Sequence, residues 1–353
     1  MTNKNPYYII TPPYRRTSAG IRVLYRLCSL LNLSGYPAYL FIYPYQHVEL
    51  ASSPVDNTPI LTESIAQYHF DIGLTPIVIA PESINVTKFS PPIFVRYYLH
   101  YKSFLNDIND DQLEDFSLFY TQRIRDKLED CSQKGESLFI LVSNPWFFTP
   151  PPGRNIKRSG CAFYAGKYKD TFNQKTSDCT KSCVEITRDK STSQSPEQIR
   201  EIFRSVEVFY SYEDTALTIE ANLCGCPVIF VPNKYLEVPL IESEMKKLGY
   251  TMGHSDAGLE HAKSTVDSAR NSFINYYTSP LNLSDGSFIY NSQNLAKDTH
   301  YSKMFAKGYF YKQSSFSLIM ITLHQMIAYI RDFGLFWFFG KVYKRIKTFR
   351  FYF

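Results

Sequence analysis

The chain has 353 residues, of which 44% are hydrophobic, so it is long enough to form two domains of ordinary size, each with its own core. This composition excludes a protein that is disordered throughout. The net charge of +5 is too small for a protein dedicated to nucleic acid, so no nucleic-acid partner is expected. The sequence holds no uncharged apolar run of the length that a transmembrane helix needs.

The chain opens with Tyr7–Thr11 (YYIIT), an apolar run of the kind that forms a buried strand. A polar turn ending at Gly20 follows, and Ile21–Leu33 then carries apolar residues at helical spacing up to Gly35. The next apolar run, 39–44, predicts a second strand. Strand, glycine-containing turn, helix and strand in this order indicate the βαβ unit of a parallel sheet.

The same alternation continues along the chain. The proline-rich segment 145–153 is the expected linker between two α/β halves. The sequence therefore predicts two Rossmann-like domains that face each other across a cleft, over 1–150 and 151–300. Further strands are expected at 77–80, 139–142, 161–165, 184–187, 207–210 and 228–231, and further helices at 92–105, from Ser195 onward and at 215–224.

Residues 301–353 form a third region, expected to hold a crossover helix and a membrane-association tail. Residues 314–331 have the pattern of an amphipathic helix. Residues 334–353 combine many aromatic side chains with five lysines and arginines, which suits in-plane contact with an anionic membrane surface. The alternative is a last helix packed across the two domains, followed by a frayed basic end.

The seven cysteines are odd in number and widely spaced, and the chain begins without an apolar stretch of signal-peptide length. Both features indicate a cytoplasmic protein with free thiols. Cys179 and Cys183, and likewise Cys224 and Cys226, do not have the paired spacing of a zinc site, so no metal site is expected.

Ligands of paired Rossmann domains bind at the carboxyl ends of the strands, where loops lead into helix N-termini. The first such loop here is Thr17–Gly20. Its small residues, Ser18 and Gly20 among them, let backbone amides approach an anion or a sugar, and the helix dipole favours negative charge there. The loop lacks the GxGxxG spacing of a dinucleotide dehydrogenase, and any tight turn would look similar.

The second such loop opens the run Tyr212–Pro227 (YEDTALTIEANLCGCP). Glu213 and Thr215 stand at the expected helix start, where the backbone amides and the Thr215 hydroxyl can hold a diphosphate. Glu220, further along the helix, can accept hydrogen bonds from ribose hydroxyls. Acidic residues in a first helical turn are also ordinary capping residues.

This run resembles the nucleotide-sugar motif of GT-B glycosyltransferases, in which an acid, a small-residue turn, an xEA element and a GxPV element follow in order. Glu220-Ala221 and Gly225-Cys226-Pro227-Val228 match the last two elements. Other stretches resemble elements of the same bacterial subgroup (glycosyltransferase family 4-like, rhamnosyltransferase-like) in the same order: 18–39, 77–96, 165–167 and 253–266. The resemblance covers roughly residues 7–280 and implies a GT-B fold with a nucleotide-sugar donor, whose diphosphate would contact Lys167.

The chain departs from the family pattern near this motif. Many retaining members carry two glutamates eight positions apart, the first of which touches the donor sugar. Eight positions before Glu220 stands Tyr212, with Glu213 beside it, so both are donor-site candidates. The loop Ser18-Ala19-Gly20 also lacks the usual first glycine. The resemblance therefore leaves open the stereochemistry of transfer and the identity of the donor.

The chain contains no Asp-x-Asp triplet, so positive side chains and helix dipoles, not a metal ion, are expected to neutralise the departing diphosphate. Lys167 is the first candidate, with Arg158 and Lys169 behind it, although each could equally be a solvated surface charge. Glu82 follows an expected strand in the N-terminal half and would serve as general base, as acceptor ligand or as a structural residue. His254 is expected to be a loop or base-contacting residue and not a catalyst.

Together with the resemblance, these features predict a metal-independent glycosyltransferase without a cofactor, whose co-substrate is a nucleoside-diphosphate sugar. It would move a hexose or deoxyhexose to a lipid-linked glycan in O-antigen, capsule or lipopolysaccharide assembly, peripherally at the inner face of the cell membrane. Two alternatives remain: a nucleotide-sugar epimerase of the same architecture, and a catalytically degenerate scaffold subunit of a polysaccharide-assembly complex.

Overall fold

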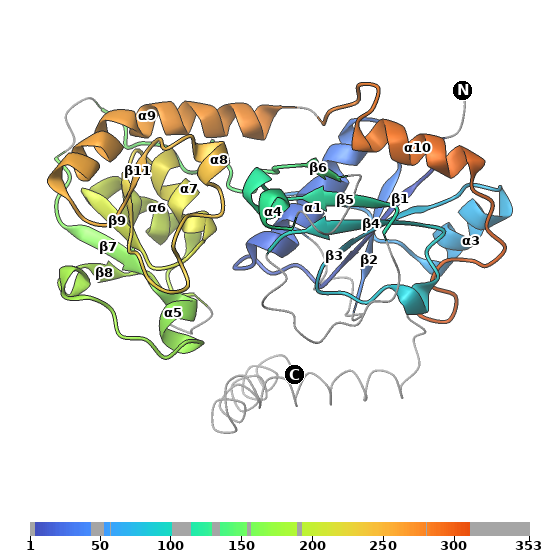
Figure 1. The fold of residues 1–353 in the computed structure, drawn as a ribbon, viewed down its shortest axis with the longest axis horizontal. Helices are drawn as coiled ribbons and strands as arrows, with labels where there is room; N and C mark the ends of the chain where they lie inside the picture. The colour runs from blue at the N-terminus through green and yellow to red at the C-terminus, as the bar shows by residue number, and fades with distance from the viewer. Residues whose placement is uncertain are drawn as a thin grey trace, which may run out of the picture.

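Two parallel β-sheets flanked by helices form the two lobes of the molecule (Figure 1). The computed structural model describes residues 4–43, 53–56, 58–100, 114–128, 135–153, 157–188, 193–279 and 281–310. The N-terminal sheet has the strand order β2 (Ala38–Ile42), β1 (Tyr7–Thr11), β3 (Ile77–Pro81), β4 (Ile93–Tyr98), β5 (Phe116–Phe119) and β6 (Gly135–Ser137). The C-terminal sheet has the order β11 (Tyr250–Met252), β10 (Val228–Phe230), β9 (Val208–Ser211), β7 (Cys161–Tyr164) and β8 (Val184–Glu185).

Helices connect the strands as in two Rossmann-like units. The first lobe contains α1 (Ala19–Leu33), α3 (Glu63–Asp71), the 3₁₀ turn η1 (Thr87–Phe89) and α4 (Gln122–Lys127). The second contains α5 (Gly166–Asp170), the 3₁₀ turn η4 (Asp178–Thr180), α6 (Pro196–Ser205), α7 (Ala216–Leu223), α8 (Glu242–Met245) and α9 (Asp256–Thr278). A last described helix, α10 (Phe288–Asp298), lies against the first lobe (Figure 1).

Each sheet reverses its strand order at one point, and this fixes where a ligand can bind. In the first sheet the chain moves from β1 outward to β2, then returns to β3 on the other side of β1. In the second sheet it moves from β7 to β8 and returns to β9 on the other side of β7. Such reversals leave a crevice at the carboxyl ends of the two central strands. The segments that leave these ends are 12–18 and Glu82 in one lobe, and 165–167 and 212–215 in the other.

Local sequence signals explain the helices that border these crevices. The N-cap Ser18 accepts a hydrogen bond from the amide of Ile21, and one face of α1 is buried in the core. Thr215 caps α7 by accepting from the Leu217 amide, and every residue of α7 is buried. After α7, Gly225 adopts φ +74°, a left-handed conformation that ends the helix with little strain only for glycine.

The sequence-based predictions of two elements are wrong. The stretch 92–105 was expected to be helical, but β4 occupies Ile93–Tyr98 and all six of its residues are buried. Its aromatic and β-branched residues suit a strand that has neighbours on both sides. The strand expected at 139–142 is also absent from the described structure, where the last strand of this sheet is β6 at Gly135–Ser137.

The chain returns to the first lobe earlier than the sequence indicates. The third region was expected to begin at 301, yet α10 already packs on the first lobe. The amide of Asn5 donates to Gln293 Oε1 at 3.1 Å, and the hydroxyls of Tyr7 and Ser292 lie 2.9 Å apart. Phe305 then packs on Phe41 in the core below β2. The expected amphipathic helix and basic tail at 314–353 lie outside the described residues.

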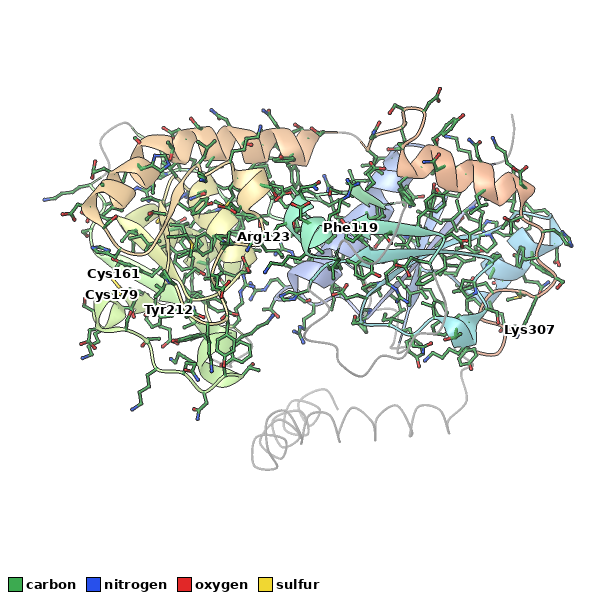
Figure 2. The ribbon with its side chains drawn as sticks, viewed as in Figure 1. Phe119, Arg123, Cys161, Cys179, Tyr212 and Lys307 are labelled. Atoms are coloured by element: carbon green, nitrogen blue, oxygen red, sulfur yellow. A yellow bond between two sulfur atoms is a disulfide. The ribbon has the colours of Figure 1, made fainter. Side chains whose placement is uncertain are left out.

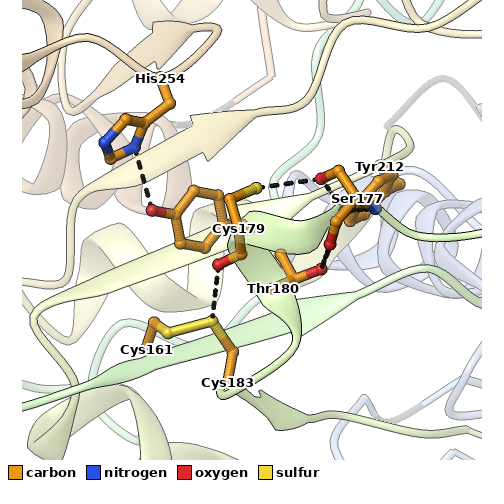
Figure 3. Close-up of a disulfide and its surroundings, with 8 residues drawn as sticks. Cys161, Ser177, Cys179, Thr180, Cys183, Tyr212 and His254 are labelled. Carbon is orange, nitrogen blue, oxygen red and sulfur yellow. Dashed lines mark hydrogen bonds between the residues drawn. A yellow bond between two sulfur atoms is a disulfide. The ribbon is translucent and has the colours of Figure 1, made fainter.

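A disulfide joins Cys161 at the start of β7 to Cys183 just before β8 (Figure 3). The expectation of free thiols is therefore wrong for these two residues. The physical reason is the pairing of β7 with β8, where Ala162 lies opposite Val184, so the preceding cysteines meet. Among the described residues the free cysteines are Cys28, Cys224 and Cys226, which are buried, and Cys179, which is exposed.

We expect reduction of this disulfide to lower the free energy of unfolding by about 3 kcal/mol, since the bond closes a loop of intermediate length in the unfolded chain. The two cysteines are separated by 22 positions. The measurement uses a Cys179→Ser variant, in which the exposed thiol of Cys179 cannot exchange with the disulfide. Its unfolding by urea would be compared with and without a phosphine reductant. A further Cys161→Ser, Cys183→Ser variant should not respond to the reductant. Equal midpoints for the oxidised and reduced protein would contradict the prediction.

Candidate functional site

A pocket with a volume of about 340 Å³ lies between the two lobes, at the crevices where both sheets reverse their strand order. The first lobe supplies the loop before α1, together with Glu82, Ser83, Leu99 and His100. The second lobe supplies Lys167, Arg188 and the start of α7. Six of the eight expected site residues line this pocket: Ser18, Gly20, Glu82, Lys167, Glu213 and Thr215.

The lobes also touch beside the pocket through α4 and α8. The amide of Gln122 donates to Glu244 Oε1 at 3.2 Å. Arg123, which Figure 2 shows on the side of the first lobe that faces the second, lies 3.7 Å from the Glu242 carboxylate. These contacts hold the carboxyl ends of the two sheets on either side of one pocket.

The helix starts on both sides present backbone amides to the pocket. In the loop before α1, the Ser18 side chain caps its own helix. A Cβ added at Gly20 would meet Leu99 at 3.5 Å, which is ordinary contact, so the protein itself does not require glycine there. On the opposite side, Thr215 begins α7. Two helix N-termini therefore border the same pocket, an arrangement that favours an anionic ligand.

The two acids before α7 take part in local contacts. Glu213 Oε1 accepts a hydrogen bond from the Lys167 amide at 2.8 Å, and burial raises the pKa of this carboxyl while the Lys167 charge lowers it. Asp214 Oδ1 accepts from the Leu240 amide at 2.7 Å, and burial raises its pKa to about 6. Both acids therefore tie neighbouring loops to the start of α7, but neither caps the helix, since Thr215 is its N-cap and no acid lies in its first turn.

Lys167 is the only one of the three expected cations that lines the pocket, at the first turn of α5. Lys169 instead places its ammonium 2.6 Å from Glu185. Arg158 donates to the backbone carbonyls of Phe203 and Cys224 at 2.6 and 2.7 Å, and so fastens α6 to the end of α7.

Glu82 directly follows β3 and is held by backbone groups. Its Oε2 accepts from the Leu99 amide at 2.9 Å. Burial raises the pKa of this carboxyl, and the hydrogen bonds and the nearby Arg96 partly oppose that shift. The buried Arg96 guanidinium donates to the carbonyls of Pro81 and Ile84, on either side of Glu82. A carboxyl of raised pKa at the pocket wall is a suitable general base.

Glu220 lies behind the pocket wall, only 4% exposed. Its carboxylate faces the first lobe: Oε1 accepts from the Ser143 hydroxyl at 3.2 Å and lies 3.5 Å from Arg22 Nη1. Oε2 lies 4.0 Å from Arg188 Nη2. Glu220, the residue expected to bind the ribose of the donor, therefore also forms an ion pair with Arg22 of the first lobe.

Tyr212 lies outside the pocket lining and is 1% exposed. Its hydroxyl contacts Ser177 Oγ at 2.6 Å and Thr180 Oγ1 at 2.9 Å, and so anchors the segment that carries the exposed Cys179 (Figure 3). This placement does not favour a contact between Tyr212 and the donor sugar. His254 also lies outside the lining, with its Nδ1 3.0 Å from the Tyr210 hydroxyl (Figure 3).

Arg188 is a pocket residue that the sequence analysis did not single out. Its side chain is 10% exposed, and its Nη1 donates to the Thr17 carbonyl of the first lobe at 3.2 Å. Its Nε is buried without a hydrogen-bond partner among the described residues. A signal was present in the sequence, because Arg188 follows the strand expected at 184–187, whose carboxyl end belongs at the ligand-binding edge.

Within the described ranges, no cluster of His, Cys, Asp or Glu has the makeup of a metal site. In the same ranges, no helix combines the length and apolar character that crossing a membrane requires.

Comparison with known structures identifies the fold. The apo form of the lipopolysaccharide outer core galactosyltransferase WaaB is similar at a TM-score of 0.50 and 12% identity, over 83% of this chain and 99% of that chain. A glycosyltransferase from Rickettsia africae is similar at a TM-score of 0.49 and 10% identity, over 84% of this chain and 98% of that chain. A putative UDP-N-acetylglucosamine 2-epimerase from Listeria monocytogenes gives a TM-score of 0.39 at 9% identity, over 86% of this chain and 99% of that chain.

No family model and no curated protein matches the sequence. The likeness to WaaB and the two parallel sheets confirm the expected GT-B fold, an α/β architecture of two Rossmann-like lobes.

Proposed function

We propose that this protein is a glycosyltransferase that uses a nucleoside-diphosphate sugar. The observation that carries the proposal is the pocket between the lobes, bordered by the N-termini of α1 and α7 and by the cations Lys167 and Arg188. A diphosphate leaving group needs this kind of charge neutralisation, and a fixed site supplies it without a reorganisation of solvent. The GT-B fold, seen also in a lipopolysaccharide galactosyltransferase, supports the same reaction class.

The pocket residues divide into two roles in this proposal. Lys167, Thr215 and the amides at the start of α7 bind the donor diphosphate, with Ser18 and Gly20 facing them from the first lobe. Glu220 binds the ribose. Glu82 lies on the acceptor side of the pocket and removes the proton from the attacking hydroxyl. No step requires a metal ion or a cofactor in this scheme.

The acceptor proposed is a lipid-linked glycan of surface polysaccharide or lipopolysaccharide assembly, reached at the inner face of the cell membrane. Its support is the composition of 334–353, which combines many aromatic residues with five basic ones. Deletion of 334–353 should abolish sedimentation with vesicles that contain anionic lipid, while nucleotide binding persists. Unchanged sedimentation of the truncated protein would refute the anchoring role.

A nucleotide screen tests the proposed activity. Thermal shift and calorimetry with UDP-, GDP-, dTDP- and CMP-sugars should identify a donor, because a ligand that binds only the folded state raises the melting temperature. An epimerase would convert this donor without an acceptor, whereas a glycosyltransferase would leave its sugar configuration unchanged until an acceptor is added. A protein that binds none of these nucleotides would contradict the proposal and favour the scaffold alternative.

A further inference from the structure

The carboxylate of Glu220 connects the two lobes behind the pocket wall. It belongs to α7 of the second lobe, yet the partners of Oε1 among the described residues belong to the first lobe: the Ser143 hydroxyl at 3.2 Å and Arg22 Nη1 at 3.5 Å. The residue is 4% exposed, so water compensates little of its charge. A buried carboxylate is tolerated only when paired and hydrogen-bonded. The first lobe therefore supplies groups that Glu220 requires.

The groups of the first lobe are themselves held in place. Arg22 lies in α1, and its Nη2 donates to the carbonyl of Val142 at 2.7 Å. Val142 directly precedes Ser143, so the guanidinium and the hydroxyl belong to one hydrogen-bonded unit. This unit holds one oxygen of Glu220 in a defined position. The hydrogen bond within this unit joins two segments of the first lobe.

The two oxygens of Glu220 are used unequally. Among the described residues, Oε1 has two partners, whereas the nearest cationic group to Oε2 is Arg188 Nη2 at 4.0 Å, beyond hydrogen-bond distance. A carboxylate oxygen can accept two hydrogen bonds, so Oε2 retains capacity for a hydroxyl donor. Arg188 itself lines the pocket, so Oε2 is the oxygen of Glu220 that lies next to a pocket residue.

We propose that Arg22 and Ser143 are positioning residues for the donor nucleotide, which hold Oε1 of Glu220 so that Oε2 can bind the ribose. This inference rests on the proposed function and deepens it. The first lobe controls the affinity for the donor because its residues hold the carboxylate of Glu220 in place. The nucleotide binds at full affinity only when the two lobes stand in the observed arrangement. Separation of the lobes would free Oε1 and leave Glu220 with several rotamers.

The test compares Arg22→Gln with Arg26→Gln, a matched control one turn further along α1. The two arginine side chains are 15% and 17% exposed, but Arg26 pairs with Asp56 at 3.2 Å and lies over the Tyr277 ring at 4.5 Å, so its partners differ from those of Arg22. The dissociation constant of the nucleoside diphosphate that the wild type binds is measured by calorimetry, and donor KM and kcat by an assay of transfer. Arg22→Gln should weaken nucleotide binding about tenfold and raise donor KM, because it removes the ion pair that holds Oε1 of Glu220, with kcat less affected. Arg26→Gln should change neither.

A double-mutant cycle separates positioning from general damage to the fold. Once Glu220→Gln has removed the carboxylate charge, adding Arg22→Gln should cause no further loss of affinity. Additive losses, an equal loss in Arg26→Gln, or nucleotide binding by Arg22→Gln as tight as in the wild type would each overturn the inference. If Arg22→Gln does not fold by circular dichroism, Ser143→Ala decides: weaker binding supports the inference and unchanged binding overturns it. Failure of the wild type to bind any nucleotide would instead overturn the proposed function, and this inference with it.

Discussion

Replacement of Glu82 by glutamine is expected to lower the rate of sugar transfer by about 10²- to 10⁴-fold, the usual contribution of a general base. The substitution is nearly isosteric, and the glutamine oxygen can still accept the hydrogen bond that the Leu99 amide donates to Oε2. The loop after β3 should therefore keep its shape. What the variant loses is the ability to take a proton from the acceptor hydroxyl, so kcat should fall while nucleotide affinity stays the same.

The pH dependence of the reaction gives a second measurement on the same residue. Burial raises the pKa of Glu82 above its ordinary value. A base acts in its ionised form, so kcat/KM of the wild type should fall as the pH drops through this raised pKa, and Glu82→Gln should lack that limb. Ser83→Ala, a neighbour on the same pocket wall, is the matched control and should retain the wild-type profile. A Glu82→Gln variant within threefold of the wild-type rate would leave Glu82 as a structural or acceptor-binding residue.

The stability of Glu82→Gln should distinguish loss of chemistry from loss of fold. Because the pKa of Glu82 is raised in the folded state, the folded protein binds more protons here than the unfolded chain between the two pKa values. Ionisation of Glu82 therefore costs stability as the pH rises through that window. The glutamine variant does not ionise, so it should be at least as stable as the wild type at neutral pH.

The parts of the fold that the sequence predicted correctly are those fixed by local signals. Helices α1 and α7 follow from the spacing of their apolar residues, and in the structure Ser18 and Thr215 cap them. The stretch 92–105 has no local signal that distinguishes a helix from a strand, because a continuous apolar and aromatic run fits a buried strand as well as a helix. Only the presence of β3 and β5 on either side makes Ile93–Tyr98 a strand.

In the candidate site, too, some features follow from local sequence and others depend on tertiary contacts. Parallel sheets bring the carboxyl ends of their strands to one edge, so Ser18 could be placed near Glu82, and Lys167 near Thr215, from the expected strands of each half. Contacts between distant positions could not be predicted in this way. The disulfide depends on the register of β7 against β8, and the surroundings of Glu220 depend on how the two lobes meet.

Replacement of Lys167 by methionine is expected to lower kcat/KM for the donor by about 10²- to 10³-fold, the cost typical of removing one group that stabilises a developing anion. Lys167 stands at the first turn of α5 and lines the pocket beside the start of α7. The loss should be large for a nucleoside diphosphate and small for the nucleoside alone, because the ammonium interacts with phosphate charge and not with the base. Calorimetry with both ligands measures this difference.

Lys169→Met is the matched control for this prediction, since Lys169 lies in the same short helix but pairs with Glu185 at 2.6 Å. It should leave diphosphate affinity unchanged. Loss of the Lys167 charge should also raise the pKa of Glu213 further, because that charge now lowers it against the effect of burial. The backbone amide of residue 167 still donates to Glu213 in the variant, so the loop itself should hold. Equal losses in the two lysine variants would show that a general change in surface charge, and not a diphosphate contact, explains the effect.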